Sequence, residues 1–249
     1  PNGPGAPHER GHPGIVRLYH TFQDAMRLYF LMAYEPGTEL WSLMLHDGKL
    51  VGMRPSLAKH CLAQVVMALE HLRKKNVVHR DLKPENVIVL NSGRVVLVDF
   101  GTSRDLAPGA KLNGPSFVGT AEYMSPEVVA NSKDVRTEAD LWALGCMVYQ
   151  ASDGDSPFKG GSQYLTHLKT QRGLRNGHEF PPQASKETRS LVQALCMLRP
   201  QDRIGSETGS GTVDADAVVA LPVGAEASCT PSTASAEGKG FHALRSHPY

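Results

Sequence analysis

Apolar residues recur at intervals of three and four along the most regular segment of the chain, Ser56–Lys75. One stripe carries them: Leu57, Cys61, Leu62, Val65, Val66, Leu69 and Leu72. This spacing places the apolar side chains on one face of an α-helix, where they can be buried against a core. The pattern therefore predicts a long amphipathic helix, with the Ser56 hydroxyl as its N-terminal cap.

A second segment, Thr137–Ser152, is apolar enough to predict another buried helix. At its start, Thr137 and Asp140 have the spacing of a capping box. Weaker patterns predict the remaining helices at Glu39–His46, Ser162–Gln171 and Lys186–Leu198.

Apolar β-type segments predict strands elsewhere. Ile15–Phe22 and Leu28–Ala33 are expected to be adjacent strands, because Gln23-Asp24 opens a turn between them. Short pieces downstream predict three more strands, Val77-Val78, Val87–Leu90 and Val95–Val98, with Asn91-Ser92-Gly93 as the turn between the last two. Two strands followed by a mainly helical body indicate an α+β fold.

The two ends of the chain differ from its centre. Residues 1–11 are rich in Pro and Gly and lack a periodic pattern, so we expect an irregular start. Residues from about 206 to 240 are rich in Gly, Ala, Ser and Thr and are interpreted as a low-complexity insertion. The first residue is Pro1 rather than Met, which favours a piece of a longer protein.

Overall composition excludes several classes of protein. The 249 residues carry 26 Lys and Arg against 25 Asp and Glu, so charge gives no reason to expect nucleic acid or an anionic membrane as partner. No apolar run is long enough for a transmembrane helix. The cysteines lack the spacing of a zinc site or a disulfide framework, which favours a reducing, cytoplasmic compartment. They are Cys61, Cys146, Cys196 and Cys229.

The candidate chemistry is concentrated in the string HRDLKPEN at His79–Asn86, which is followed by DFG from Asp99. Phosphoryl transfer needs an aimed nucleophile, positive charge near the γ-phosphate and hard oxygen ligands for Mg²⁺. Asp81 can accept the proton of a substrate hydroxyl, and Lys83 can offset phosphate charge. The expected metal ligands are Asn86 and Asp99. Each residue alone is more often a turn or surface residue, so the prediction depends on the whole string.

These motifs resemble those of the protein kinases, whose catalytic loop and D-F-G element read this way. Lys83 indicates the serine/threonine type, because the tyrosine-specific members lack a lysine there. The resemblance implies protein substrates, ATP and Mg²⁺ as cofactors, and a kinase-like fold. Residues 12–35 would be a remnant of the small lobe with the hinge, and residues 36–249 the large lobe.

Other landmarks of the family follow in the expected order. A Ser-Pro-Glu sequence that ends at Glu127 resembles the family's A-P-E, and Arg203 matches the partner of that Glu. Thr120 matches a Thr that braces the catalytic Asp and Lys. Asp140 matches a buried Asp that holds the catalytic-loop backbone; the alternative is its capping-box role with Thr137, and both can hold.

The activation segment offers a candidate phosphorylation site at Ser116. In the family, the Arg of the catalytic loop receives an activation-loop phosphate, and Arg80 stands at that position. A phosphate on Ser116 would add negative charge that Arg80 and Arg104 could bind.

Within the family, the resemblance is greatest to the 3-phosphoinositide-dependent kinases of the AGC group. Three segments carry it: Leu18–Asp24, Ser116–Tyr123 and Asp140–Gln150. It covers about His12–Gly205 and the closing Phe241–Tyr249. These kinases phosphorylate activation loops of their relatives and dock hydrophobic-motif peptides in a small-lobe pocket, two of whose residues match Gln23 and Leu28. Membrane lipid would bind only through a domain outside this chain.

Three parts of the family pattern are absent from the 249 residues: the G-x-G-x-x-G loop, the V-A-I-K lysine and the Glu that pairs with it. Without them the phosphates lose their cover and one cation, so we expect this chain to bind ATP poorly and to be nearly inactive. The adenine contacts that the resemblance implies are Met32 as gatekeeper, Ala33 and Glu35 in the hinge, Glu39 at the ribose and Ile88 beneath the ring. The shortened small lobe would leave an uncovered apolar face prone to aggregation.

Two hypotheses remain. The intact catalytic and metal-binding residues favour a serine/threonine kinase whose parent gene encodes the missing parts, whereas the missing lysine favours a non-catalytic, pseudokinase-like scaffold. A penicillin-binding reading of Ser56 and Lys59 as S-x-x-K is set aside, because no S-D-N or K-T-G follows. The histidines near the ends lack metal-ligand spacing. They are His8, His12, His242 and His247.

Overall fold

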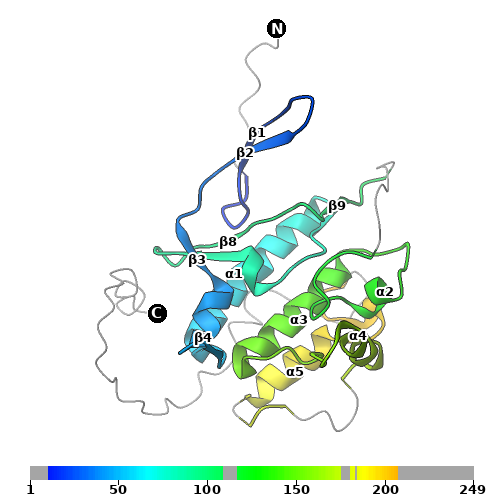
Figure 1. Cartoon of the computed structure of the whole chain (residues 1–249). Coiled ribbons are helices and arrows are strands. Elements are labelled where there is room, and N and C mark those ends of the chain that lie inside the picture. The colour runs from blue at the N-terminus through cyan, green and yellow to red at the C-terminus, as the bar shows by residue number, and fades with distance from the viewer. Residues whose placement is uncertain (1–10, 109–116, 175–179, 183, 207–249) are drawn as a thin grey trace.

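The computed structural model describes residues 11–108, 117–174, 180–182 and 184–206 (Figure 1). Its α-helices are α1 (Pro55–Lys74), α2 (Pro126–Val129), α3 (Glu138–Asp153), α4 (Gln163–Arg172) and α5 (Lys186–Leu195). Short 3-10 helices are η1 (Leu40–Met44), η2 (Pro84–Asn86) and η3 (Pro200–Asp202). The strands are β1 (Leu18–Gln23), β2 (Leu28–Met32), β3 (Gly37–Glu39), β4 (Leu45–His46), β5 (Lys49–Leu50), β6 (Val77–Val78), β7 (Val87–Leu90), β8 (Val95–Leu97) and β9 (Arg104–Asp105). Residues 1–10 of the expected irregular start and residues 207–240 of the expected insertion lie outside the described residues.

The helices α1, α3 and α5 build the core. Nearly every residue of α3 is buried, because apolar side chains surround the helix on all sides. Trp142 of α3 is fully buried and stacks on Phe158, with ring centroids 4.7 Å apart. The apolar stripe expected on α1 is buried as well, from Cys61 to Leu72.

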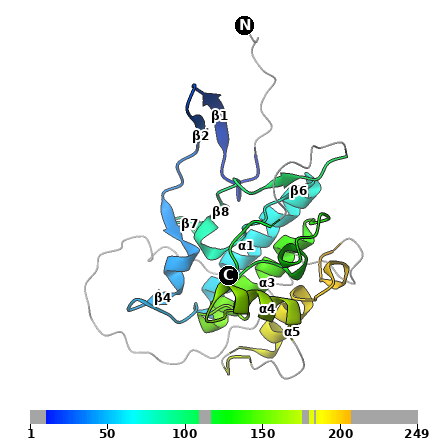
Figure 2. The same cartoon turned by 45° about the vertical axis from the view of Figure 1, so that its right-hand side comes forward.

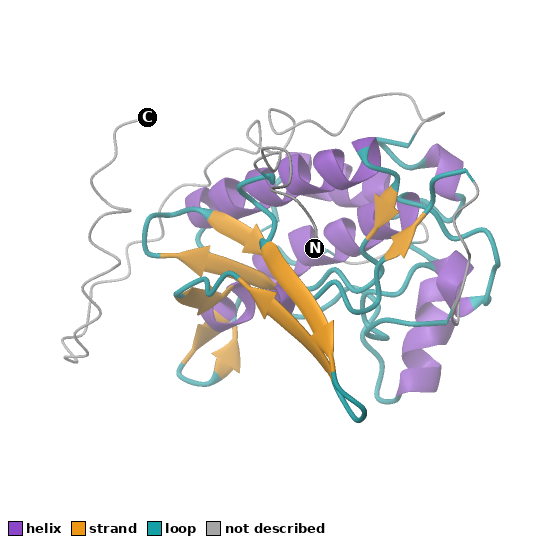
Figure 3. Cartoon of the chain, turned by 90° about the horizontal axis from the view of Figure 1, so that it is seen from above, coloured by secondary structure: helices purple, strands orange, loops and turns teal. Residues whose placement is uncertain are grey.

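A three-stranded sheet of order β3-β7-β8 lies on one side of the helices, as the view from above shows (Figure 3). Its strands are antiparallel, and β3 pairs Glu39 with Ile88 of β7. Gly37 is required at the start of β3, since a Cβ there would lie 2.5 Å from the Val89 carbonyl oxygen. The chain before the hairpin β1–β2 joins this sheet through a parallel bridge between Ile15 and Leu97.

The hairpin β1–β2 forms a separate two-stranded sheet that projects away from the helices in two views (Figures 1 and 2). Nearly all of its side chains are exposed, including large apolar ones on both faces. Phe22 is 58% exposed, Leu28 68% and Phe30 60%. The uncovered apolar face that the sequence predicts is therefore present in the described structure.

Two local expectations about helix capping were wrong. Pro55 occupies the first turn of α1 and Arg54 is its N-cap, so Ser56 lies inside the helix and caps nothing. Thr137 has helical dihedral angles, φ −59° and ψ −21°, and its side chain makes no capping bond to α3. The short helix expected at Glu39–His46 is present as the 3-10 helix η1, and the short strand β4 follows it.

Within the described residues, no helix combines the length and apolar character needed to cross a membrane. Three of the four cysteines fall in this part of the chain, and all three are buried free thiols: Cys61, Cys146 and Cys196.

Candidate active site

A carboxylate of α3 fixes the backbone of the loop between β6 and η2. Asp140 Oδ2 accepts the backbone N–H of His79 at 2.8 Å, and its Oδ1 accepts that of Arg80 at 2.9 Å. Burial raises the pKa of Asp140, while these two hydrogen bonds and the nearby His79 and Arg80 oppose that rise. These contacts are the backbone anchor implied by the family resemblance; the capping-box alternative is not formed. Arg80 has φ +70°, a left-handed conformation that the anchor holds in place.

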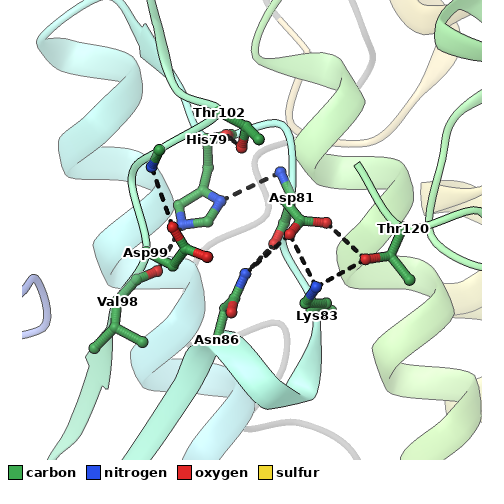
Figure 4. Close-up of polar contacts among 9 residues, drawn as sticks. His79, Asp81, Lys83, Asn86, Val98, Asp99, Thr102 and Thr120 are labelled. Carbon is green, nitrogen blue, oxygen red and sulfur yellow. Dashed lines mark hydrogen bonds and ion pairs between the residues drawn. The ribbon is translucent and has the colours of Figure 1, made fainter. Parts of the chain in front are cut away.

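Three side chains converge at the centre of the site (Figure 4). Lys83 Nζ lies 3.0 Å from Asp81 Oδ2 and donates to Thr120 Oγ1 at 2.8 Å, and Thr120 in turn donates to Asp81 Oδ1 at 2.9 Å. Burial alone would raise the pKa of Asp81, but hydrogen bonds from Lys83 and Thr120 and the lysine charge outweigh it, so the pKa is lowered. The result is an oriented carboxylate that stays ionised at neutral pH, beside a cation.

Asn86 and Asp99 lie on one side of Asp81, with Thr120 on the other (Figure 4). Asn86 Nδ2 donates to the carbonyl oxygen of Asp81 at 2.8 Å and to its Oδ2 at 3.2 Å. The amide nitrogen therefore faces Asp81, which leaves Asn86 Oδ1 as an acceptor. Asp99 has φ +58° and an exposed carboxylate that accepts the N–H of Gly101 at 3.2 Å.

Sequence reasoning missed the residues that join the catalytic loop to the Asp99 segment. His79 is fully buried, its Nε2 donates to the Val98 carbonyl at 3.1 Å, and its ring meets Phe100 edge to face. Thr102 Oγ1 donates to the His79 carbonyl at 3.1 Å. Phe100 and Thr102 stand directly beside a motif that was recognised, so their position could have indicated a supporting role.

The predicted partners Glu127 and Arg203 meet in a two-pronged ion pair. The guanidinium donates to both carboxylate oxygens at 2.7 Å, and its side chain is fully buried while that of Glu127 is 11% exposed. It also donates to the carbonyls of Met197 and Glu138 and lies over the Trp142 ring. This pair ties α2 to α3 and to the loop after α5.

The remaining predicted residues are spread over the hairpin, the segment after it and the β3–β7 pair. Met32 ends β2 and is 48% exposed, and Ala33 donates its N–H to the Arg17 carbonyl. Glu35 forms an ion pair with Arg94 at 3.0 Å, an interaction the sequence did not predict. The structure brings Glu39 opposite Ile88 in the sheet, and it places Gln23 opposite Leu28 beside the hairpin turn.

The candidate activation segment is described in part. Arg80 Nε donates to the Thr102 carbonyl, and the charge of Arg104 acts on Arg80: burial first, then Arg104, lowers the pKa of Arg80. The two cations therefore lie near one another, with Arg104 buried. Ser116 lies outside the described residues, so its distance from them is not part of the described structure.

Comparison with known proteins is consistent with this geometry. The family model described as "Protein kinase domain" matches residues 7–211. The chain is 38% identical over 201 residues to 3-phosphoinositide-dependent protein kinase 1 of Rattus norvegicus, which covers 80% of this chain and 35% of that protein. It is 35% identical over 206 residues to the serine/threonine-protein kinase ksg1 of Schizosaccharomyces pombe, covering 78% of this chain and 34% of the relative.

A third relative, the serine/threonine-protein kinase PDK1 of Cryptococcus neoformans, is 36% identical over 197 residues, which is 77% of this chain and 15% of that protein. The chain thus spans about a third or less of the length of these curated relatives.

Proposed function

Because the chain belongs to the protein kinase domain family, we propose that its parent protein is a serine/threonine protein kinase, a transferase that moves the γ-phosphoryl group of ATP to protein hydroxyls. The observation that carries the proposal is the triangle of Asp81, Lys83 and Thr120, in which the carboxylate is ionised, aimed and paired with a cation. A surface aspartate would need none of these restraints.

In this proposal Asp81 accepts a hydrogen bond from the substrate hydroxyl and takes up its proton as the new O–P bond forms, while the bond between the γ-phosphorus and the β–γ bridging oxygen breaks and ADP leaves. A third restraint, the hydrogen bond from Asn86, helps to keep the carboxylate from rotating away. Lys83 carries a positive charge 3.0 Å from that carboxylate and offsets negative charge on the transferred group. Thr120 fixes the distance between the two.

The donor set fits Mg²⁺ bound together with a nucleotide. Among the described residues, no group of three or more His, Cys, Asp or Glu side chains could hold a metal ion without further ligands. Mg²⁺ usually takes one or two protein oxygens and completes its shell with substrate phosphates and water. Asn86 Oδ1 and the Asp99 carboxylate would be the protein ligands. When bound, Mg²⁺ neutralises phosphate charge and orients the phosphates.

For the adenine, we propose the hinge backbone at Ala33 and Glu35, with Met32 as the gatekeeper. Glu39 would reach the ribose and Ile88 would pack beneath the ring, which their pairing in the β3–β7 ladder supports. In domain terms, residues 12–35 would serve as the remnant of the small lobe with the hinge, and residues 36–249 as the large lobe with its insertion.

The substrates we propose are activation loops of related kinases, with Gln23 and Leu28 belonging to a docking pocket for hydrophobic-motif peptides. Identity to the 3-phosphoinositide-dependent kinases supports this choice. A phosphate on Ser116 would bind Arg80 and Arg104, which would make the parent protein a phosphoprotein. We also propose a cytoplasmic location, with any lipid binding left to a domain outside this chain.

The 249-residue chain itself should be nearly inactive, because its sequence contains neither a G-x-G-x-x-G loop nor the phosphate-binding lysine. The same feature favours the second candidate function, a non-catalytic scaffold. Sequencing of the parent transcript separates the two: a kinase requires upstream codons for both parts, and their absence would leave the scaffold.

A chimera tests the catalytic proposal directly. The segment that precedes His12 is replaced by the corresponding segment of a relative that contains the glycine-rich loop and lysine, and transfer of radiolabelled phosphate to a serine peptide is measured. We expect transfer by the chimera and background signal from the native chain. The matched control, the chimera with Asp81→Asn, should fold and remain inactive. Equal transfer with and without Asp81→Asn would refute the assignment.

A further inference from the structure

We propose that Arg94 is a positioning residue that clamps the hinge and the chain before β1 to the large lobe. Its guanidinium reaches two separate stretches: Nη2 lies 3.0 Å from Glu35 Oε2, and Nη1 donates to the Pro13 carbonyl at 3.4 Å. These stretches, near residues 13–17 and 33–36, are the two places where the chain crosses between the hairpin β1–β2 and the rest of the protein (Figure 1).

The turn that carries Arg94 is a rigid platform. Gln64 of α1 holds the residues on both sides of it, since Nε2 donates to the Gly93 carbonyl at 2.9 Å and Oε1 accepts the Val95 N–H at 3.0 Å. The backbone of Arg94 accepts the N–H of Leu90 at 2.9 Å and closes the turn between β7 and β8. The turn that bears the Arg94 guanidinium is therefore held by α1 and the sheet, both of which belong to the core.

The first crossing has backbone support of its own. Val16 donates to the Leu97 carbonyl, and Leu97 donates to that of Gly14, both at 2.9 Å. The second crossing is held at its far end by β3, where Gly37 fits against Val89. Between these supports, the Glu35 carboxylate is the described side chain that connects residues 34–36 to the platform.

Glu35 is the more buried partner of the pair. The Glu35 side chain is 13% exposed and that of Arg94 is 45% exposed, so the pair is screened less than one in open solvent. Ion pairs with an exposed partner change equilibria modestly, so loss of this pair should raise the population of displaced hairpin orientations about two- to fivefold.

The functional consequence rests on the proposed function. Glu35 is one of the two hinge residues proposed to face adenine, so Arg94 would set where that backbone lies before a nucleotide arrives. If only a fraction of the molecules have the hinge in the binding position, the apparent affinity for the ligand is the intrinsic affinity multiplied by that fraction. Arg94 would thus tune adenine affinity without touching the adenine.

Pulsed electron–electron spin resonance on the full chain tests the clamp without any nucleotide. Spin labels are placed at Met26→Cys on the hairpin turn and at Tyr164→Cys on α4, which are 88% and 69% exposed. Cys229 is replaced by serine, and the other cysteines are buried. The protein is kept dilute enough to prevent association.

We expect a main distance peak for the native pair, with a minor population that grows about two- to fivefold in Arg94→Gln and in Glu35→Gln. The double variant should add nothing to Arg94→Gln, because that single change already removes the contact to Glu35. Arg94→Lys keeps the charge and should rescue in part. The matched control, Arg136→Gln, removes an exposed arginine paired with Asp134 and should change nothing. Unchanged distance distributions in both single variants, or additive effects in the double one, would overturn the clamp.

Titration with adenosine, followed by NMR, separates the clamp from the proposed function. If the distance populations shift but no variant binds adenosine, the nucleotide proposal fails and the clamp stands. If adenosine binds, its affinity should fall in Arg94→Gln in proportion to the loss of the main distance population. Binding that is equally tight in both would overturn the role of Arg94 in positioning the hinge.

Discussion

The hairpin β1–β2 and the helix α3 are built from equally apolar sequences, yet they have opposite surroundings. Leu144 and Met147 of α3 are fully buried, whereas Phe22 and Leu28 of the hairpin are more than half exposed. The helix is surrounded by α1, α5 and Phe158, while the two strands of the hairpin pair only with each other in the described structure. Two-stranded hairpins are marginally stable without further cover.

This difference teaches where the candidate active site gets its geometry. Asp140, the anchor of the catalytic loop, is part of α3, and the triangle around Asp81 depends on Lys83 and Thr120. None of these residues belongs to the hairpin. The residues proposed to carry out phosphoryl transfer are therefore arranged by the core, and the hairpin contributes only the proposed gatekeeper Met32 and the proposed docking contacts.

The largest effect is expected from the buried ion pair of the core. Glu127→Ala leaves the fully buried Arg203 without its carboxylate, which should cost about 3–5 kcal/mol of unfolding free energy. Urea denaturation followed by tryptophan fluorescence measures it. The control Asp134→Ala breaks an exposed pair with Arg136 and should cost no more than about 0.5 kcal/mol. Equal losses of unfolding free energy in the two variants would contradict the expected difference between the buried and the exposed ion pair.

Equivalent leucine truncations compare the two regions directly. Leu144→Ala opens a cavity in the core and should cost about 2–5 kcal/mol. Leu31 is 51% exposed on the hairpin, and Leu31→Ala should change stability by no more than about 0.5 kcal/mol. Both are measured by the same urea titration. A large loss for Leu31→Ala would mean that the hairpin is packed in solution against something that covers it.

Self-association tests whether the exposed apolar faces of the hairpin are available for contact with other molecules. Its open edges and exposed apolar faces should make the chain associate at high concentration. The variant with Phe22→Ser and Phe30→Ser should raise the concentration needed for association about tenfold, as followed by sedimentation velocity. Tyr164→Ser removes a similarly exposed aromatic residue from α4 and serves as the control. If the control acts as strongly as the hairpin variant, association runs through another surface.

The smallest expected effect is the pH dependence of local stability at residues 13–17, where the chain enters the hairpin. Burial, and then the nearby His71, lower the pKa of His12 from its usual value of 6.5, and its Nδ1 accepts the Gly14 N–H at 3.1 Å. A lowered pKa means that the folded state favours neutral His12, so its contribution is present above pH 6.5 and is lost as pH falls through the lowered value. Amide exchange at Val16, corrected for intrinsic rates, should rise a few-fold below pH 6.5. The rise should be absent in His12→Gln.

Local patterns predicted the elements well because each depends on neighbours in sequence. The helix stripe of α1, the strands β1 and β2 and the turn at Gly93 were all confirmed. The HRDLKPEN string also places Asp81, Lys83 and Asn86 together, since they lie within six residues. Such signals reach only a few residues along the chain.

The features that the sequence did not predict have two causes. Either another interaction competes for the residue, or the two partners lie far apart along the chain. Pro55 takes the first helical position and moves Ser56 into the helix, and Asp140 is engaged by the catalytic loop instead of a cap. The pair of Glu35 and Arg94 joins residues 59 positions apart, and nothing local to either one indicates the other. Contacts of this kind are set by the packed fold, which is why the sequence did not contain a visible signal for them.

The central claim is that the core holds the candidate active site without help from the hairpin. Native-state hydrogen exchange of the full chain tests it most directly. The amides of His79 and Arg80, which donate to Asp140, should exchange at the rate of global unfolding. The amide of Ala33, which donates to Arg17 inside the hairpin segment, should exchange at least about 100-fold faster. Equal protection of Ala33 and His79 would contradict the account, because it would make the hairpin part of the same cooperative unit as the catalytic loop.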